Sequence, residues 1–142
     1  MRLKTLALGS ALAALAVTQV TAQTVPDFAP VTDANIQNPD PADWLSWRRT
    51  LDSWGYSPLD QINRENVEQL RMVWAMPLNS GHQEGTPLVH EGIMYFPGPA
   101  DTIHAIDAAS GQLIWRYQRQ LPEDIGDYLP VYDTTRNVAI YG

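Results

Sequence analysis

The sequence contains no cysteine, only nine basic residues and a single lysine, Lys4. The lack of cysteine excludes a disulfide scaffold, a thiol nucleophile, a zinc finger and a lipid-modified cysteine. Sixteen acidic residues give a formal net charge of −7. This balance argues against a protein that binds nucleic-acid backbones, because such a protein needs a basic face. The rest of the composition, 44% hydrophobic and 18% charged, is typical of a globular protein.

The N-terminal segment, residues 1–22, has the features of a secretory signal peptide. Arg2 and Lys4 form its positive region, an apolar run follows from Leu6 to Val17, and small residues end at Ala22. The apolar run is shorter than the roughly 20 residues that cross a bilayer. We therefore expect cleavage after Ala22 rather than a stable membrane anchor, and export of the mature protein to a bacterial periplasm.

Short helices are predicted between this segment and the first strands. Residues 23–39 contain three prolines and no hydrophobic period, which indicates an extended leader. Residues 40–55 are expected to begin a helix at an Asp-Pro cap, and residues 63–70 a second one. Apolar residues alternate over residues 72–76, which predicts a strand. The first helix is expected to place three apolar side chains on one face: Trp44, Trp47 and Leu51.

Four further strands with tight turns are predicted after residue 85. They cover residues 86–89, 93–96, 102–107 and 113–117, and the turns between them contain Gly, Pro, Asp or Ser. Four short strands in succession favour an antiparallel meander in an all-β protein.

Short similar segments recur in and around these predicted strands. Similar tripeptides and tetrapeptides around Trp74 and Trp115, Pro87 and Pro130, and Tyr95 and Tyr141 are separated by about 41 to 46 residues. A four-stranded unit with this period is typical of a β-propeller blade. The sequence holds one complete blade with flanking strands. Because a blade buries its faces only against other blades, we expect the chain to be the N-terminal piece of a longer protein.

Several segments resemble the pyrroloquinoline quinone (PQQ)-dependent alcohol dehydrogenases of the methanol/ethanol dehydrogenase type. Taken together and in order, they cover residues 44–142. The segments that carry the resemblance are Trp47-Arg48-Arg49-Thr50 through Asn63, Asn66-Val67 to Trp74, Gly81 to Val89 with Gly92 to Tyr95, Ala105 to Trp115, and Arg136 to Gly142.

The resemblance implies that residues 40–142 are the start of an eight-bladed β-propeller with PQQ near its axis. It implies oxidation of an alcohol with PQQ as hydride acceptor, a calcium or lanthanide ion as Lewis acid, and a cytochrome c-type electron acceptor. The metal ligands and the general base are expected outside this sequence, so the resemblance places no catalytic residue and no metal ligand within it.

Two residues match cofactor-binding positions of the family, Glu84 and Arg136. By resemblance, Glu84 hydrogen-bonds PQQ and Arg136 contacts its quinone oxygens with a planar, permanently charged guanidinium. The plainer alternatives are a surface carboxylate for Glu84 and a surface pair with Asp133 for Arg136. Pro130 and Val131 stand where many family members have two adjacent cysteines, so another apolar contact must cover that side of the cofactor.

Other motifs have structural interpretations. The pattern of Asp107, Gly111 and Trp115 resembles the family's tryptophan-docking motif, in which Trp115 offers a flat surface to a neighbouring blade. The three histidines, His82, His90 and His104, lack the spacing of metal ligands. His90 and His104 are expected in surface or core roles, whereas His82 is close enough to Glu84 in the sequence to line the site. This docking motif also occurs in non-catalytic PQQ-repeat propellers, so an envelope scaffold is the alternative function. Such scaffolds are commonly lipoproteins, and this sequence has no cysteine to carry a lipid.

Overall fold

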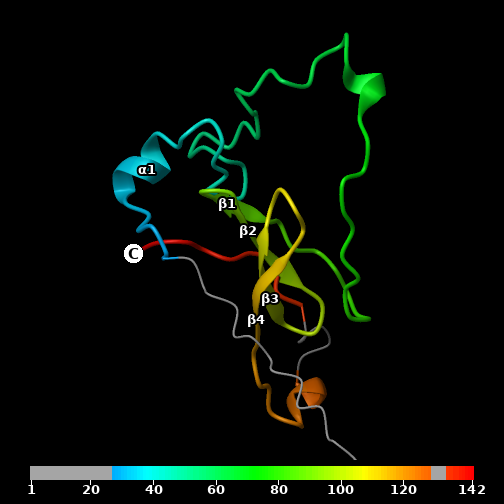
Figure 1. The fold of residues 1–142 in the computed structure, drawn as a ribbon. Coiled ribbons are helices and arrows are strands. Elements are labelled where there is room, and N and C mark those ends of the chain that lie inside the picture. The colour runs from blue at the N-terminus through cyan, green and yellow to red at the C-terminus, as the bar shows by residue number, and fades with distance from the viewer. Residues whose placement is uncertain (1–26, 129–133) are drawn as a thin grey trace, which may run out of the picture.

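A single four-stranded antiparallel sheet forms the centre of the computed structural model, which describes residues 27–128 and 134–142. The sheet consists of β1 (Leu88–His90), β2 (Ile93–Gly98), β3 (Thr102–Asp107) and β4 (Leu113–Gln118). The strands lie in the order β1-β2-β3-β4, so each strand pairs with its neighbour in the sequence (Figure 1). The predicted all-β meander is therefore confirmed. The predicted signal peptide, residues 1–22, lies outside the described residues.

The turns of the sheet explain why these strands pair locally. Glu91 and Gly92 join β1 to β2 with positive φ angles of 47° and 77°, which suits a tight turn between antiparallel strands. Ala100 and Asp101 join β2 to β3, again with positive φ. The β3–β4 pairing shifts between Ala105 and Ile106. Both of these β3 residues are buried, as is Leu88 of β1.

A tryptophan docks on the β3–β4 turn. The indole Nε1 of Trp74 donates a hydrogen bond to the carbonyl oxygen of Ala108 at 3.0 Å. Gly111 has a φ of 73°, and a Cβ on it would lie 2.5 Å from Cδ2 of Trp74. The glycine therefore provides both the turn conformation and the space for the ring. Trp115, from the same motif, instead lies beside Tyr95, with ring centroids 6.1 Å apart.

The proline-rich leader differs from the extended segment expected for residues 23–39. It contains helix α1 (Asp33–Gln37). Thr32 caps this helix and forms a capping box with Asn35, which satisfies backbone donors at the helix start. The cap was not expected because the spacing of apolar residues gives no signal in a five-residue helix.

The helix predicted over residues 40–55 is wrong, since the structure has turns there. Trp44 forms an isolated antiparallel bridge with Val89 of β1, with hydrogen bonds of 2.8 and 2.9 Å in the two directions. Arg49 and Ser53 have φ angles of 69° and 60°, which no right-handed helix accommodates. Trp47 and Leu51, expected to face inward, are exposed.

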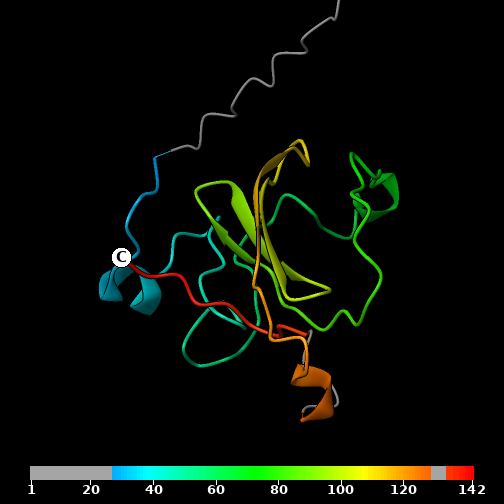
Figure 2. The same ribbon diagram turned by 90° about the horizontal axis from the view of Figure 1, so that it is seen from below.

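Residues 56–85 form a long arm that extends away from the sheet before returning to β1 (Figures 1 and 2). The second predicted helix is reduced to a 3₁₀ turn, η1 (Val67–Gln69), and the predicted strand over residues 72–76 is absent. Most apolar side chains of the arm are exposed, so the described residues offer little packing that would stabilise regular elements there.

A second 3₁₀ turn, η2 (Ile125–Asp127), follows β4. The C-terminal segment then passes back beside the sheet and ends near α1 (Figure 2). The amide of Gly142 donates to the carbonyl oxygen of Val31 at 3.2 Å, which brings the two described ends of the chain together. Among the described residues, no helix has the length and apolar character needed to cross a membrane.

Candidate functional site

The structure brings together the two side chains that the sequence singles out. Nε of Arg136 donates to Oε2 of Glu84 at 2.5 Å, although the residues are 52 positions apart. Glu84 lies in the loop before β1, and Arg136 lies in the C-terminal segment. Both side chains are partly exposed, 45% for Glu84 and 66% for Arg136. The alternative partner considered for Arg136, Asp133, lies outside the described residues.

The backbone around this ion pair is held against the sheet. The amide of Thr86 donates to the carbonyl oxygen of Arg136 at 3.1 Å. Thr134 forms an antiparallel bridge with Pro99, just after β2. The C-terminal segment is thus hydrogen-bonded on one side to the loop that carries Glu84 and on the other to the residue that follows β2.

The glycines that flank Glu84 allow close packing of the chain against β2. A Cβ on Gly85 would lie 2.4 Å from the carbonyl oxygen of Pro97, and one on Gly81 would lie 2.8 Å from Cβ of Pro99. Gln83 adds a hydrogen bond from Nε2 to the Pro97 oxygen at 3.1 Å. These glycines therefore make room for the end of β2 and the residue after it.

The three histidines occupy different environments. His82 is exposed in the loop of Glu84. His90 is buried at the end of β1, with Nδ1 2.8 Å from Oδ2 of Asp43 and Nε2 3.0 Å from the carbonyl oxygen of Ala29. His104 is buried in β3. His90 and His104 thus have the core positions that the sequence allowed. The described residues contain no group of three His, Cys, Asp or Glu side chains that could hold a metal ion.

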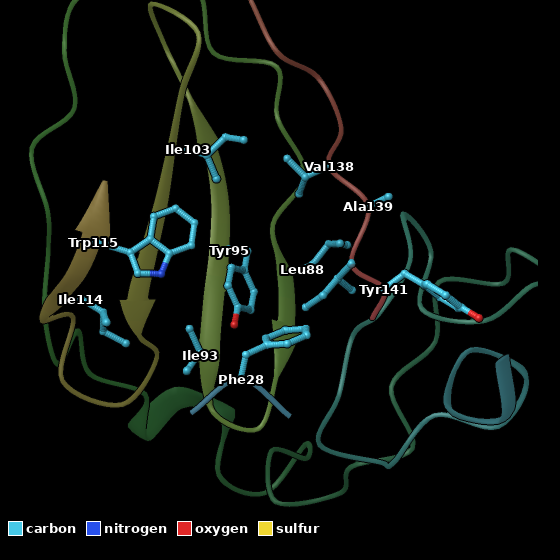
Figure 3. Close-up of a pocket in the computed structure, with 11 residues that line it drawn as sticks. Phe28, Leu88, Ile93, Tyr95, Ile103, Ile114, Trp115, Val138, Ala139 and Tyr141 are labelled. Carbon is cyan, nitrogen blue, oxygen red and sulfur yellow. The ribbon is translucent and has the colours of Figure 1, made fainter. Parts of the chain in front are cut away.

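A separate apolar cavity of about 560 Å³ lies on the sheet (Figure 3). Trp115, Tyr95 and Phe28 contribute aromatic walls, and the C-terminal segment supplies Val138 and Tyr141. Burial raises the pKa of Tyr95, and the nearby carboxylate of Glu91 adds to the effect. Glu84 and Arg136 do not line this cavity, so it is distinct from the ion pair.

Residues 44–141 match the protein family described as the PQQ glucose/ethanol/alcohol dehydrogenase, beta-propeller domain. The chain belongs to this family. The resemblance seen in the sequence is therefore confirmed, as is the partial propeller fold, since the four-stranded sheet lies within the matched residues.

Curated relatives of this PQQ propeller chain include an alcohol dehydrogenase (quinone), dehydrogenase subunit, from Gluconacetobacter polyoxogenes. It is 39% identical over 127 residues, which are 87% of this chain and 17% of the relative. A 1-butanol dehydrogenase (cytochrome c) from Thauera butanivorans is 37% identical over 87 residues, 61% of this chain and 13% of the relative. The chain thus spans less than a fifth of the length of these relatives.

Solved structures of similar fold include quinohemoprotein alcohol dehydrogenase from Pseudomonas putida HK5. It has a TM-score of 0.70 and 36% identity, over 79% of this chain and 17% of that structure. A europium-containing methanol dehydrogenase has a TM-score of 0.66 and 23% identity, over 77% of this chain and 19% of that structure. The second similarity concerns the fold alone.

The chemistry of the Glu84–Arg136 pair fits a quinone that carries carboxylates. Among the residues that the structure describes, Arg136 bonds to Glu84 through Nε. The terminal nitrogens of a guanidinium are suited to donate to carbonyl or carboxylate oxygens. Oε2 of Glu84 accepts from Arg136, which leaves Oε1 as a further polar atom of the site. The positions that replace the family's cysteine pair, Pro130 and Val131, lie outside the described residues.

One polar residue of this region was missed at the sequence level. Asp101 is buried beside the C-terminal segment, where it contacts Thr135. An Asp in a short turn between strands is usually interpreted as a turn former, and its partner lies 34 positions away. Sequence spacing therefore gives no signal for this contact.

Proposed function

We propose that the complete protein containing this segment is an exported quinoprotein alcohol dehydrogenase. Family membership and the contact between Glu84 and Arg136 support this proposal. The contact is the observation that carries most weight, because the resemblance nominated these two residues independently and they lie 52 positions apart. The substrate is a small alcohol, and the electron acceptor is a c-type cytochrome, as the name of the Thauera relative suggests.

Glu84 and Arg136 are the residues of this segment that hold the cofactor. When bound, PQQ supplies the two-electron acceptor for oxidation of the alcohol. With PQQ bound, Arg136 would supply a fixed positive charge to cofactor oxygens on which negative charge grows, which would stabilise the transition state. Glu84 orients the guanidinium through its hydrogen bond to Nε and offers an acceptor to the cofactor. We expect the general base and the ligands of a calcium or lanthanide ion in other parts of the protein.

Substitutions at these two positions test the proposal. In the complete protein, Arg136→Ala and Glu84→Gln should each weaken PQQ binding by about tenfold or more, since each removes a hydrogen bond to a charged group. The measurement is titration of the apoprotein with PQQ, followed by absorbance, with circular dichroism to verify the fold.

Matched controls are Arg71→Ala and Glu65→Gln, which change exposed residues of the arm. Both controls should bind PQQ like the wild type. Wild-type affinity in the two site variants would remove Glu84 and Arg136 from the cofactor site. A complete protein that binds no PQQ at all would instead favour the non-catalytic scaffold.

A further inference from the structure

The turn between β2 and β3 contains a buried carboxylate. Asp101 is only 4% exposed, although it occupies a turn and has a φ of 54°. Residues other than glycine adopt this left-handed conformation at a cost, which other interactions must offset. A buried carboxylate also needs partners, because removing it from water is unfavourable.

Asp101 obtains these partners from two other segments. Its Oδ1 accepts a hydrogen bond from the hydroxyl of Thr135, and its Oδ2 pairs with Nε of Arg119. Its carbonyl oxygen also accepts from the amide of Arg119 at 3.2 Å. The carboxylate thus joins the β2–β3 turn, the exit of β4 and the C-terminal segment.

The contact between Asp101 and Thr135 affects the direction of the next side chain, that of Arg136. Thr135 is half-buried toward Asp101, whereas the side chain of Arg136 is exposed and points to Glu84. Thr134, just before Thr135, forms an antiparallel bridge with Pro99. Where backbone pairs in this way successive side chains point to opposite sides, so fixing one restricts the direction of the next. The hydrogen bond from Thr86 to the Arg136 carbonyl and the bridge of Thr134 to Pro99 hold the same backbone on both sides.

We propose that Asp101 is a positioning residue for the cofactor-binding pair and acts through Thr135. It holds the hydroxyl of Thr135, and Thr135 sets the backbone from which Arg136 reaches Glu84. The proposal rests on the proposed function, since it assigns a purpose to the orientation of Arg136. Asp101 itself does not contact Glu84 or Arg136 through any described hydrogen bond.

Thr135→Val tests this role because valine keeps the shape of threonine and loses the hydroxyl. In the complete protein, this variant should bind PQQ about tenfold more weakly, measured by titration of the apoprotein. Thr135→Ser restores the hydroxyl and should bind within about twofold of the wild type. Thr50→Val is the matched control: it removes the hydroxyl that donates to Asp52 at 2.5 Å, outside the site, and should leave PQQ binding unchanged.

A double-mutant cycle separates positioning from a general structural effect. If Asp101 and Thr135 act through Arg136, Thr135→Val should change PQQ affinity by less than about twofold in an Arg136→Ala background. An equal loss in both backgrounds would overturn the positioning role. Wild-type affinity of Thr135→Val, while Arg136→Ala binds weakly, would also overturn it and leave the proposed function intact.

The same cycle detects failure of the proposed function itself. In that case Arg136→Ala alone binds PQQ like the wild type, and the positioning role fails with it.

Should Thr135→Val not fold, Asp101→Asn replaces it, because asparagine tolerates positive φ and accepts a weaker hydrogen bond from Thr135. We expect about threefold weaker binding for Asp101→Asn, and no loss in the Arg136→Ala background; no loss in either background would overturn the proposal.

Discussion

At the scale of single residues, the β3–β4 turn shows how a polar side chain and a glycine create a docking surface. Oδ1 of Asp107 accepts hydrogen bonds from both the amide and the hydroxyl of Ser110, each at 2.7 Å. The Ser110 hydroxyl, followed by its amide, lowers the pKa of Asp107. These bonds fix the turn, and Gly111 leaves it without a side chain where Trp74 packs.

Gly111→Ala should therefore lower the free energy of unfolding by more than an alanine with positive φ usually does. Strain alone costs about 1–2 kcal/mol, and the contact with the Trp74 ring forces a shift of either the turn or the indole. We expect a loss of about 3 kcal/mol or more in the free energy of unfolding of the complete protein, measured by urea denaturation.

Gly92→Ala provides the matched comparison for this variant. Gly92 has a similar φ of 77°, but a Cβ there would meet nothing within 4 Å. Gly92→Ala should lose only the strain energy, about 1–2 kcal/mol. Equal losses of unfolding free energy in the two variants would show that the packing of Trp74 does not depend on the absence of a side chain at Gly111.

At the scale of elements, β3 is the most buried strand of the sheet, and it carries an ionisable side chain. His104 of this strand is 6% exposed. Burial lowers the pKa of His104, and Arg116, its partner on β4, lowers it further, while the carbonyl of Phe96 opposes both. The neutral imidazole is thus the form that the folded sheet prefers.

This preference predicts an acid-sensitive contribution to stability. Because the pKa of His104 is lowered on folding, the unfolded chain binds the proton more readily. The contribution is present above the unfolded pKa of about 6.5 and decreases as the pH falls below it. A plot of unfolding free energy against pH should be steeper for the wild type than for His104→Gln, by at most about 1.4 kcal/mol per pH unit. Parallel curves for the two proteins would contradict the prediction.

The elements also show what could be predicted from the sequence. The four strands were predicted because Gly, Asp and Ser turns separate short apolar segments, and both signals are local. The helix over residues 40–55 was wrong because the positive φ of Arg49 and Ser53 has no signal in the spacing of apolar residues. Glu84 and Arg136 were nominated by resemblance, whereas Asp101 depends on a partner 34 positions away and was missed.

At the scale of the whole molecule, the described chain buries little apolar surface. Only five hydrophobic residues form its core: Val31, Leu45, Leu88, Ala105 and Ile106. Large apolar side chains are exposed at Trp54 and along the arm, where Met72 and Val73 are examples, and the cavity on the sheet has apolar walls. A core of this size is small against the conformational entropy that folding must overcome.

Residues 23–142 expressed alone should therefore lack a cooperative unfolding transition. We expect a broad thermal change by circular dichroism, strong binding of the dye ANS to the exposed apolar surface, and no oxidation of alcohol. A sharp, reversible transition of a monomer, seen at the same midpoint by circular dichroism and tryptophan fluorescence, would contradict this expectation.

The ion pair of Glu84 and Arg136 has one more consequence, because its two residues stand before and after all four strands in the sequence. A ligand that binds both side chains closes a loop around the whole sheet. Such a ligand binds the folded form and not the unfolded chain, so its binding energy adds to the stability of the sheet by mass action. If the cofactor is that ligand, as proposed above, its loading would promote folding of this part of the propeller, and folding would promote loading.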